Sequence, residues 1–481
     1  MLNKILSKLC VCMLLVGMVL GVVACGPKPG GNGDDDSWTT TGELVKDADG
    51  NVVFDNVQIT LSTVVNGEDK GPFNRLVGKF NAQYRGKINV VVNNISQDSF
   101  EMTVSKQIAN NSNAPDLIMS HQKGHQAFRN KKLIQPYDEI MEKSGITFDM
   151  KDYAAGLAKY TSLGSEYLYG VPIDAQSMVV YYNKKMLAKY SDKVPATREE
   201  FVALCEKVAK AENITPVAWS TSSMFFNQYV FPTAILQNGG TLYRTDDLKA
   251  DWTSGDNKVA FENAIEVLHD MMVGDHKIAK YNDSTSNALS SFVNNKALFY
   301  FNVPWYNDSI KETYRKTNNI ETVDMVDEYV GGASMAGWFA KDSANPAANK
   351  IYGDSHFFAI SKTVTDITKK AAICEFVKWF TTNVEAGIEW ATAGHTSVSK
   401  AIIDSDAYKS NAVVVNYLNK FYPNIDHFEC IGNTPFYDDI AKQLDALFVS
   451  AMSARSSSEY AQLIADAQKR INDRVDFLNS D

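Results

Sequence analysis

Cysteine and positive charge are both scarce in this chain of 481 residues. Six cysteines are too few for a fold built on disulfides, and 47 Lys and Arg residues are outnumbered by 57 Asp and Glu residues. The formal net charge of −10 argues against nucleic acid as a partner, because phosphate recognition needs clustered basic residues. No G-x-S-x-G elbow, Walker A loop or G-x-G-x-x-G fingerprint occurs, which removes several common enzyme classes.

The single long apolar run of the chain lies at its N-terminus. Two lysines precede the run, which extends from Leu9 to Ala24 and is shorter than the roughly 20 residues that span a bilayer. This layout is typical of a secretory signal. The last three residues of the run and the cysteine after it read Val-Val-Ala-Cys. This sequence resembles the lipobox, at which bacteria remove the leader and lipidate the cysteine. We expect residues 1–24 to be a lipoprotein signal peptide, and Cys25 to anchor the mature chain outside the cytoplasm to the bacterial membrane.

The segment after the predicted anchor differs from the rest of the chain. Residues 25–51 are rich in Gly, Pro, Asp and Thr and show no apolar period. This composition favours a flexible tether that holds a folded body away from the membrane. We expect ordered structure to begin near Val52.

Strand and helix patterns alternate from that point on. Short apolar runs predict strands at 56–64, 87–93 and 116–120, and helical periodicity predicts helices at 73–84 and 100–110. This alternation indicates parallel βαβ units with helices on both faces of a sheet. The fold class is therefore α/β.

Several short segments occur together in an order typical of one protein family. They are APDLIMS at 114–120, LIQPY at 133–137, YGVP at 169–172, YYNKK at 181–185, PATREEF at 195–201, FVNNKAL at 292–298, NVPW at 302–305 and AISK at 359–362. Together they resemble the extracellular solute-binding proteins of bacterial ABC importers, especially the carbohydrate-binding group that includes the maltose binders. Two departures stand out: Asn295 replaces a usual Gly, and Gly-Asp-Ser-His at 353–356 replaces a usual Gly-Gly.

This resemblance implies the two-lobe periplasmic-binding-protein fold, in which each lobe is a sheet flanked by helices. The chain would cross the hinge near 169–174, 353–361 and 394–400. One lobe would combine residues 52–170 and 354–394, and the other residues 172–352 and 396–481. A monomer would close on a small carbohydrate ligand in the cleft, and ABC permease subunits would recognise the closed form. No catalytic residue, cofactor or metal is expected.

Sugar ligands need aromatic faces for their C–H surfaces and polar side chains for their hydroxyls. Residues of these kinds near predicted strand ends or hinge crossings are the ligand-binding candidates. They are His121, Gln122, Asp174, Gln176, Trp219, Asn302, Trp305, Trp338 and His395. Trp379 and Trp390 are expected to be packing residues.

Other interpretations remain open at this point. A tethered carbohydrate hydrolase would need a pair of carboxylates, for which Asp438 and Asp439 are examples. A surface sensor or adhesin could use the same binding fold without a transporter. A zinc protease is disfavoured, because His121 and His125 lack the Glu of H-E-x-x-H and Gly124 lies between them.

Replacing the predicted lipidation site should detach the protein from membranes. Cys25→Ser removes the thiol that would carry the acyl chains, so the variant should move from the membrane pellet to the soluble fraction. Cell fractionation with immunoblotting measures this. Continued membrane association of Cys25→Ser would contradict the lipoprotein prediction.

Overall fold

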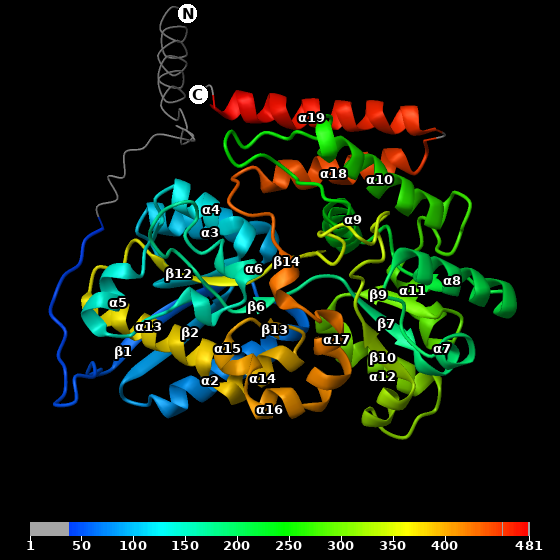
Figure 1. The fold of residues 1–481 in the computed structure, drawn as a ribbon. Coiled ribbons are helices and arrows are strands. Elements are labelled where there is room, and N and C mark those ends of the chain that lie inside the picture. Colours follow the sequence, from blue (N-terminus) through cyan, green and yellow to red (C-terminus); the bar gives the residue numbers. More distant parts are fainter. Residues whose placement is uncertain (1–37, 455, 480–481) are drawn as a thin grey trace, which may run out of the picture.

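Two separate sheets joined by short strand pairs organise residues 38–454 and 456–479, the part of the chain that the computed structural model describes (Figure 1). The predicted signal peptide and Cys25 lie outside these residues. Within the described ranges, no helix is both long and apolar enough to cross a bilayer.

The first sheet has six strands, in the order β2-β1-β3-β12-β4 with β5 paired to β12. Its strands are β1 (Val57–Thr63), β2 (Ile88–Asn94), β3 (Leu117–His121), β4 (Ile134–Gln135), β5 (Val171–Pro172) and β12 (His356–Ser361). Strands β2 and β3 run parallel to β1, whereas β12 runs antiparallel to β3. The predicted parallel βαβ units are confirmed, and β12 returns from a distant part of the chain.

Helices cover both faces of this sheet because its side chains alternate between two cores. On one face, Leu117 and Met119 share a core with Phe73 of α2 and Phe376 of α13. On the other face, Ile118 packs with residues of α3 and α4. The helices around this sheet are α2 (Lys70–Gln83), α3 (Gln97–Ala109), α4 (Gln122–Asn130), α5 (Asp138–Ser144), α6 (Ala155–Ala158), α13 (Ile367–Thr382), α14 (Val384–Thr392) and α15 (Lys400–Ile403).

The second sheet has four strands in the order β10-β7-β9-β8. They are β7 (Val179–Asn183), β8 (Val217–Ala218), β9 (Phe299–Asn302) and β10 (Val330–Ala333). Phe201 of α8 packs against this sheet through Phe299, and Tyr181 of β7 packs against Phe421 of α17. The neighbouring helices are α7 (Lys184–Tyr190), α8 (Arg198–Glu212), α11 (Thr285–Val293), α12 (Asn307–Thr317) and α17 (Asn419–Phe421), whereas α16 (Asp406–Ser410) contacts α14 and α15.

A helical layer from the middle and the end of the chain lies beyond the sheets. In Figure 1, α18 and α19 lie along one another at the top of the molecule, next to α10 and above α9. These helices are α9 (Phe231–Gln237), α10 (Gly255–Met272), α18 (Tyr437–Ala451) and α19 (Ser457–Asn479). The layer brings Tyr437, at the start of α18, close to α3 and α4 of the first sheet.

Short strand pairs connect the two sheets. Strand β6 (Asp174–Ala175) pairs antiparallel with β13 (Thr396–Ser397), and β11 (Ile351–Tyr352) pairs parallel with β14 (Phe428–Glu429). Gln176 also forms an antiparallel bridge with Asp354. The expected lobe boundaries remain a prediction, but these pairs bring the three predicted crossing segments together.

Order begins earlier than the sequence predicts. Thr41 forms a bridge with Asp366, and Lys46 forms one with Val52. Thr40 also donates a hydrogen bond to Glu139 at 2.5 Å. The expectation of a flexible tether up to residue 51 is therefore wrong for residues 38–51. Polar residues of this segment bond to helices of the first sheet. Such contacts leave no apolar periodicity in the sequence, so the sequence pattern did not reveal them.

All three cysteines of the described chain are buried and free, namely Cys205, Cys374 and Cys430. Cys205 and Cys374 lie inside α8 and α13, as the helical periodicity around them predicts. They act as small apolar core side chains.

Gly394 occupies a position between the two sheets that no other residue type can fill. Its φ is +102°, and an added Cβ would lie 2.4 Å from the Cα and N atoms of Trp305. Gly394→Ala should therefore lower the free energy of unfolding by at least about 3 kcal/mol, because neither backbone can move without disturbing the strand pairs. Urea unfolding followed by fluorescence measures this.

Gly145→Ala is the matched control, since Gly145 has a φ of +81° but no atom within 4 Å of an added Cβ. It should cost only about 1–2 kcal/mol for the left-handed backbone. Equal losses in the two variants would contradict the claim that close contact at Gly394 matters.

Candidate functional site

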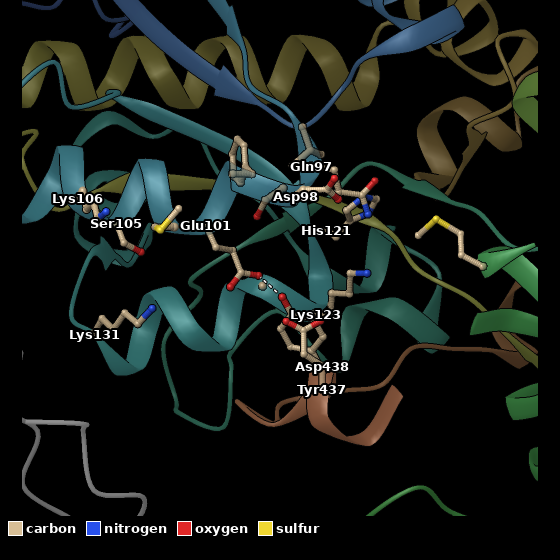
Figure 2. A pocket seen from close by; sticks show the side chains of 16 residues that line it. Gln97, Asp98, Glu101, Ser105, Lys106, His121, Lys123, Lys131, Tyr437 and Asp438 are labelled. Carbon is tan, nitrogen blue, oxygen red and sulfur yellow. Dashed lines mark hydrogen bonds between the residues drawn. The ribbon is translucent and has the colours of Figure 1, made fainter. Parts of the chain in front are cut away.

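A cavity of about 690 Å³ opens at the carboxyl ends of β1 and β3, where α/β folds place their ligands (Figure 2). Helices α3 and α4 supply most of its wall, and the ends of β1 and β3, Met224 and the start of α18 supply the rest. The lining residues are Val64, Gln97, Asp98, Phe100, Glu101, Met102, Ser105, Lys106, Ser120, His121, Lys123, Gly124, Lys131, Met224, Tyr437 and Asp438. Segments far apart in sequence therefore share one cleft.

The cleft combines exposed apolar side chains with polar ones. Met102 is 57% exposed and Met224 is 61% exposed, although both are large hydrophobic residues. They come from distant parts of the chain, since Met102 lies on α3 and Met224 lies between β8 and α9 in sequence. Exposed apolar surface within a polar cavity is typical of a binding site.

Glu101 and Tyr437 connect the two walls. The Tyr437 hydroxyl donates a hydrogen bond to the Glu101 carboxylate, as Figure 2 shows. Gly124 makes room for this carboxylate, because a Cβ there would lie 2.6 Å from Glu101 Oε1. Burial raises the pKa of Glu101 above its ordinary value, and the hydrogen bond from Tyr437 opposes this only in part.

The charges in the cleft are balanced. Lys123 lies 3.9 Å from Asp354 and 5.6 Å from the centre of the Tyr437 ring. The cleft carries three lysines and three carboxylates, namely Lys106, Lys123 and Lys131 with Asp98, Glu101 and Asp438. The formal charges of these lining residues therefore cancel.

His121 ends β3 and connects this cleft to a buried polar cluster. Its ring stacks on His356 at a centroid distance of 4.7 Å, and its Nδ1 lies 3.1 Å from Nε2 of Gln176 and 3.5 Å from Asp354. Burial lowers the pKa of His121 well below its ordinary value, so the ring is neutral near pH 7.

Asp174 is the centre of the buried cluster. Its carboxylate accepts hydrogen bonds from the backbone N of His356 at 2.7 Å and from Nε1 of Trp390 at 2.9 Å, and it lies 2.8 Å from Nδ1 of His356. Burial alone would raise the pKa of Asp174. The adjacent histidines outweigh burial and hold this pKa well below its ordinary value.

His395 lies between two indole rings. Its ring is parallel to Trp390 at a centroid distance of 3.9 Å and to Trp305 at 6.2 Å. Burial opposes its positive charge, but its contacts with Asp174 and Asp69 raise the pKa of His395 to about 9. The cluster therefore joins β6, β12 and the residues before β13 through charge and stacking.

Five of the predicted site residues meet in or beside this cluster: His121, Asp174, Gln176, Trp305 and His395. Among them, His121 lines the cleft, whereas Asp174, Gln176 and His395 are at most 2% exposed. For these three, the structure favours a role in the connection between the sheets over direct contact with ligand.

The other four candidates lie elsewhere and are corrected by the structure. Trp219 and Trp338 are buried in the second sheet's core, where their indole nitrogens donate to the carbonyls of Lys280 and Pro195. The remaining two are also buried. Asn302 donates to the Tyr300 hydroxyl at 2.5 Å, and Gln122 donates to the carbonyl of Gly432 at 3.1 Å. Strand ends alone do not indicate which side chains face the cleft.

Sequence reasoning missed important partners in both places. In the cleft it missed Glu101, Lys123 and Tyr437, and in the cluster it missed Asp69 and His356 and treated Trp390 as packing only. The unusual Gly-Asp-Ser-His at 353–356 was the available signal, since it supplies both Asp354 and His356. No sequence pattern links Glu101 to Tyr437, because their contact depends on how the α18 layer lies against α3.

The profile of the family described as bacterial extracellular solute-binding protein matches residues 65–386, which is more than half of the chain. The chain belongs to this family. As a solute-binding protein of an extracellular family, it acts outside the cytoplasm.

Curated relatives match over shorter stretches. The multiple sugar-binding protein of Streptococcus mutans is 30% identical over 155 residues, which cover 30% of this chain and 35% of the relative. The sn-glycerol-3-phosphate-binding periplasmic protein of Salmonella typhimurium is 27% identical over 123 residues, which cover 24% and 28%. The matched part of this chain thus spans about a third of the length of these relatives.

Solved structures confirm the two-lobe fold. The sugar-binding protein MalE from Xanthomonas citri has a TM-score of 0.70 at 16% identity, over 88% of this chain and 100% of that one. The cyclic alpha-maltosyl-1,6-maltose binding protein from Arthrobacter globiformis has a TM-score of 0.68 at 15% identity, over 89% and 100%. At sequence identities of 15–16%, this structural similarity establishes the fold of the chain and no more than the fold.

The raised pKa of Glu101 predicts a pH-dependent effect of its replacement. A carboxyl group whose pKa is higher in the folded state destabilises that state once the pH rises above the unfolded pKa. Glu101→Gln removes this ionisation and keeps an oxygen for Tyr437, so it should raise the melting temperature near pH 7. The gain should shrink as the pH falls below about 4, where both proteins are neutral at this position.

Differential scanning calorimetry across pH 3.5 to 8 provides the measurement. Glu142→Gln, on the surface helix α5, is the control and should show no comparable pH trend. A melting temperature of Glu101→Gln that falls below wild type at pH 7 and recovers in acid would reverse the sign and overturn the prediction.

Proposed function

We propose that this solute-binding protein captures a sugar or oligosaccharide and delivers it to the membrane permease of an ABC importer, while a lipid on Cys25 holds it at the membrane. The family membership and the two-lobe fold support the general role. The lining of the cleft supports a sugar as the ligand.

The observation that carries the proposal is the mixed lining of the cleft. Amide, carboxylate, hydroxyl and ammonium groups on α3, α4 and α18 match the hydroxyls of a sugar. Met102, Met224 and the Tyr437 ring offer apolar surface for the C–H faces. A volume of about 690 Å³ lies within the range of small-ligand sites.

Charge favours a neutral sugar over a phosphorylated ligand. The two curated relatives are named for sugars and for sn-glycerol-3-phosphate, respectively. A phosphate carries two negative charges near pH 7 and would need an excess of basic groups or free backbone N–H groups. The lysines of this cleft are matched by carboxylates, and this balance supports an uncharged ligand.

A thermal-shift screen tests the proposal. The full-length chain in detergent is incubated with neutral mono- and oligosaccharides and with sn-glycerol-3-phosphate, and hits are measured by calorimetry. A neutral sugar should raise the melting temperature, because it binds only the folded state. Stabilisation by sn-glycerol-3-phosphate alone would contradict the choice of ligand, and release of cleavage products would contradict the binding role.

Replacing His121 should weaken binding of the sugar found in this screen. Its ring lines the cleft and has a side chain 14% exposed, so it is placed to share a hydrogen bond with ligand. His121→Ala should lower the affinity about tenfold or more, since a lost buried hydrogen bond costs about 1–3 kcal/mol. Lys193→Ala, which breaks an exposed ion pair with Glu200, is the control and should bind like wild type. Equal affinities for all three proteins would remove His121 from the site.

A further inference from the structure

The buried cluster beside the cleft holds three groups in an arrangement that suits a metal ion. Asp174, His356 and His395 each offer one ligand-type atom, and these atoms lie within 4.8 Å of one another. Oδ2 of Asp174 is 2.8 Å from Nδ1 of His356 and 3.3 Å from Nδ1 of His395. Two ligands of a tetrahedral zinc ion are about 3.3 Å apart when the bonds are about 2.0 Å long.

The surroundings of His395 favour positive charge at this point. Its Nε2 lies 3.2 Å from the carboxylate of Asp69 and donates its hydrogen there. Its Nδ1 is buried and lies 3.3 Å from the oxygen of Asp174, outside hydrogen-bond geometry. Two carboxylates therefore face one buried ring, and they need positive charge between them. A proton on the ring supplies this charge in the metal-free protein, and a metal ion that displaces the proton from Nδ1 would supply it when bound.

Residues that are not ligands themselves hold two of the three ligand side chains in place through hydrogen bonds. Asp69 orients His395, the indole N–H of Trp390 bonds to Oδ2 of Asp174 at 2.9 Å, and the backbone N of His356 bonds to Oδ1 at 2.7 Å. A carboxylate that accepts from the far nitrogen of a histidine ligand is a recurring feature of metal sites, because it fixes the ring's tautomer and orientation.

We propose that Asp174, His356 and His395 form a zinc site in which water takes the fourth position. Two imidazoles and one carboxylate are a donor set suited to zinc, whereas calcium and magnesium prefer oxygen ligands alone. The double charge of the ion also balances the carboxylates of Asp174 and Asp69, which face His395 from opposite sides.

This site has a structural consequence because its ligands come from the three crossing segments. Asp174 belongs to β6, His356 begins β12, and His395 lies between α14 and β13. A zinc ion bound there joins all three and fixes how the two sheets meet. Binding to the folded state alone stabilises the protein in proportion to the logarithm of the zinc concentration.

Zinc content and thermal stability test the site without any sugar. The full-length chain in detergent is stripped with EDTA, incubated with zinc chloride alone, passed through a desalting column and analysed by mass spectrometry for metal. Wild type should retain one zinc per chain and gain in melting temperature. His395→Gln and His356→Gln should lose both effects. His276→Gln, which alters a partly exposed histidine beside Glu206, should behave like wild type.

A further variant keeps the test independent of any failure to fold. Trp390→Phe leaves all three ligands in place and removes only the indole hydrogen bond to Asp174. It should bind zinc about 10- to 100-fold more weakly than wild type, the usual effect of losing an outer partner of a metal ligand. Wild type that retains no zinc above the buffer blank would overturn the proposal. Equal retention by His395→Gln would also overturn it, because the zinc would then be bound elsewhere.

Discussion

The burial of one carboxylate, Asp174, governs how the two halves of this protein meet. A charged group without exposure costs several kcal/mol in lost solvation, and the folded state tolerates it only when donors or positive charge surround it. Here those groups come from β12, from α14 and from the residue before β13. Because each is distant from Asp174 in sequence, satisfying this one charge requires all three crossing segments to adopt a single arrangement.

The same arrangement reaches the ligand cleft through His121. This residue stacks on His356 in the cluster and also lines the cavity, so a movement of the crossing segments shifts the cleft wall directly. On the far side of the cavity, Glu101 and Lys123 contact Tyr437 of α18. Closure of a two-lobe protein is a change in such contacts. The cleft is thus bounded by one fully buried connection and one partly buried connection.

The local structure of this chain was predictable from its sequence, whereas the composition of the site was not. Periodicity identified β1, β2, β3, α2 and α3 because each pattern depends on neighbouring residues. Trp338 illustrates the limit. Its position after Ala-Gly suggests a loop that faces ligand, but its ring stacks on Phe201 at 4.2 Å in a core that forms only when α8 covers the second sheet. The pairing of Asp174 with His395 is likewise invisible before β6 and β13 are known to pair.

The two departures from the family pattern differ in their physical meaning. Asn295 replaces a glycine, yet it keeps a left-handed φ of 58° and adds hydrogen bonds to Asn183 and Tyr314, so the turn is preserved. The change at 353–356 has a different effect, because it adds His356 and Asp354 to the region between the sheets. Glycines there could offer Asp174 only a backbone N–H and could not stack on His121. This second departure therefore lies in the connection between the lobes, and it reaches the ligand surface through His121.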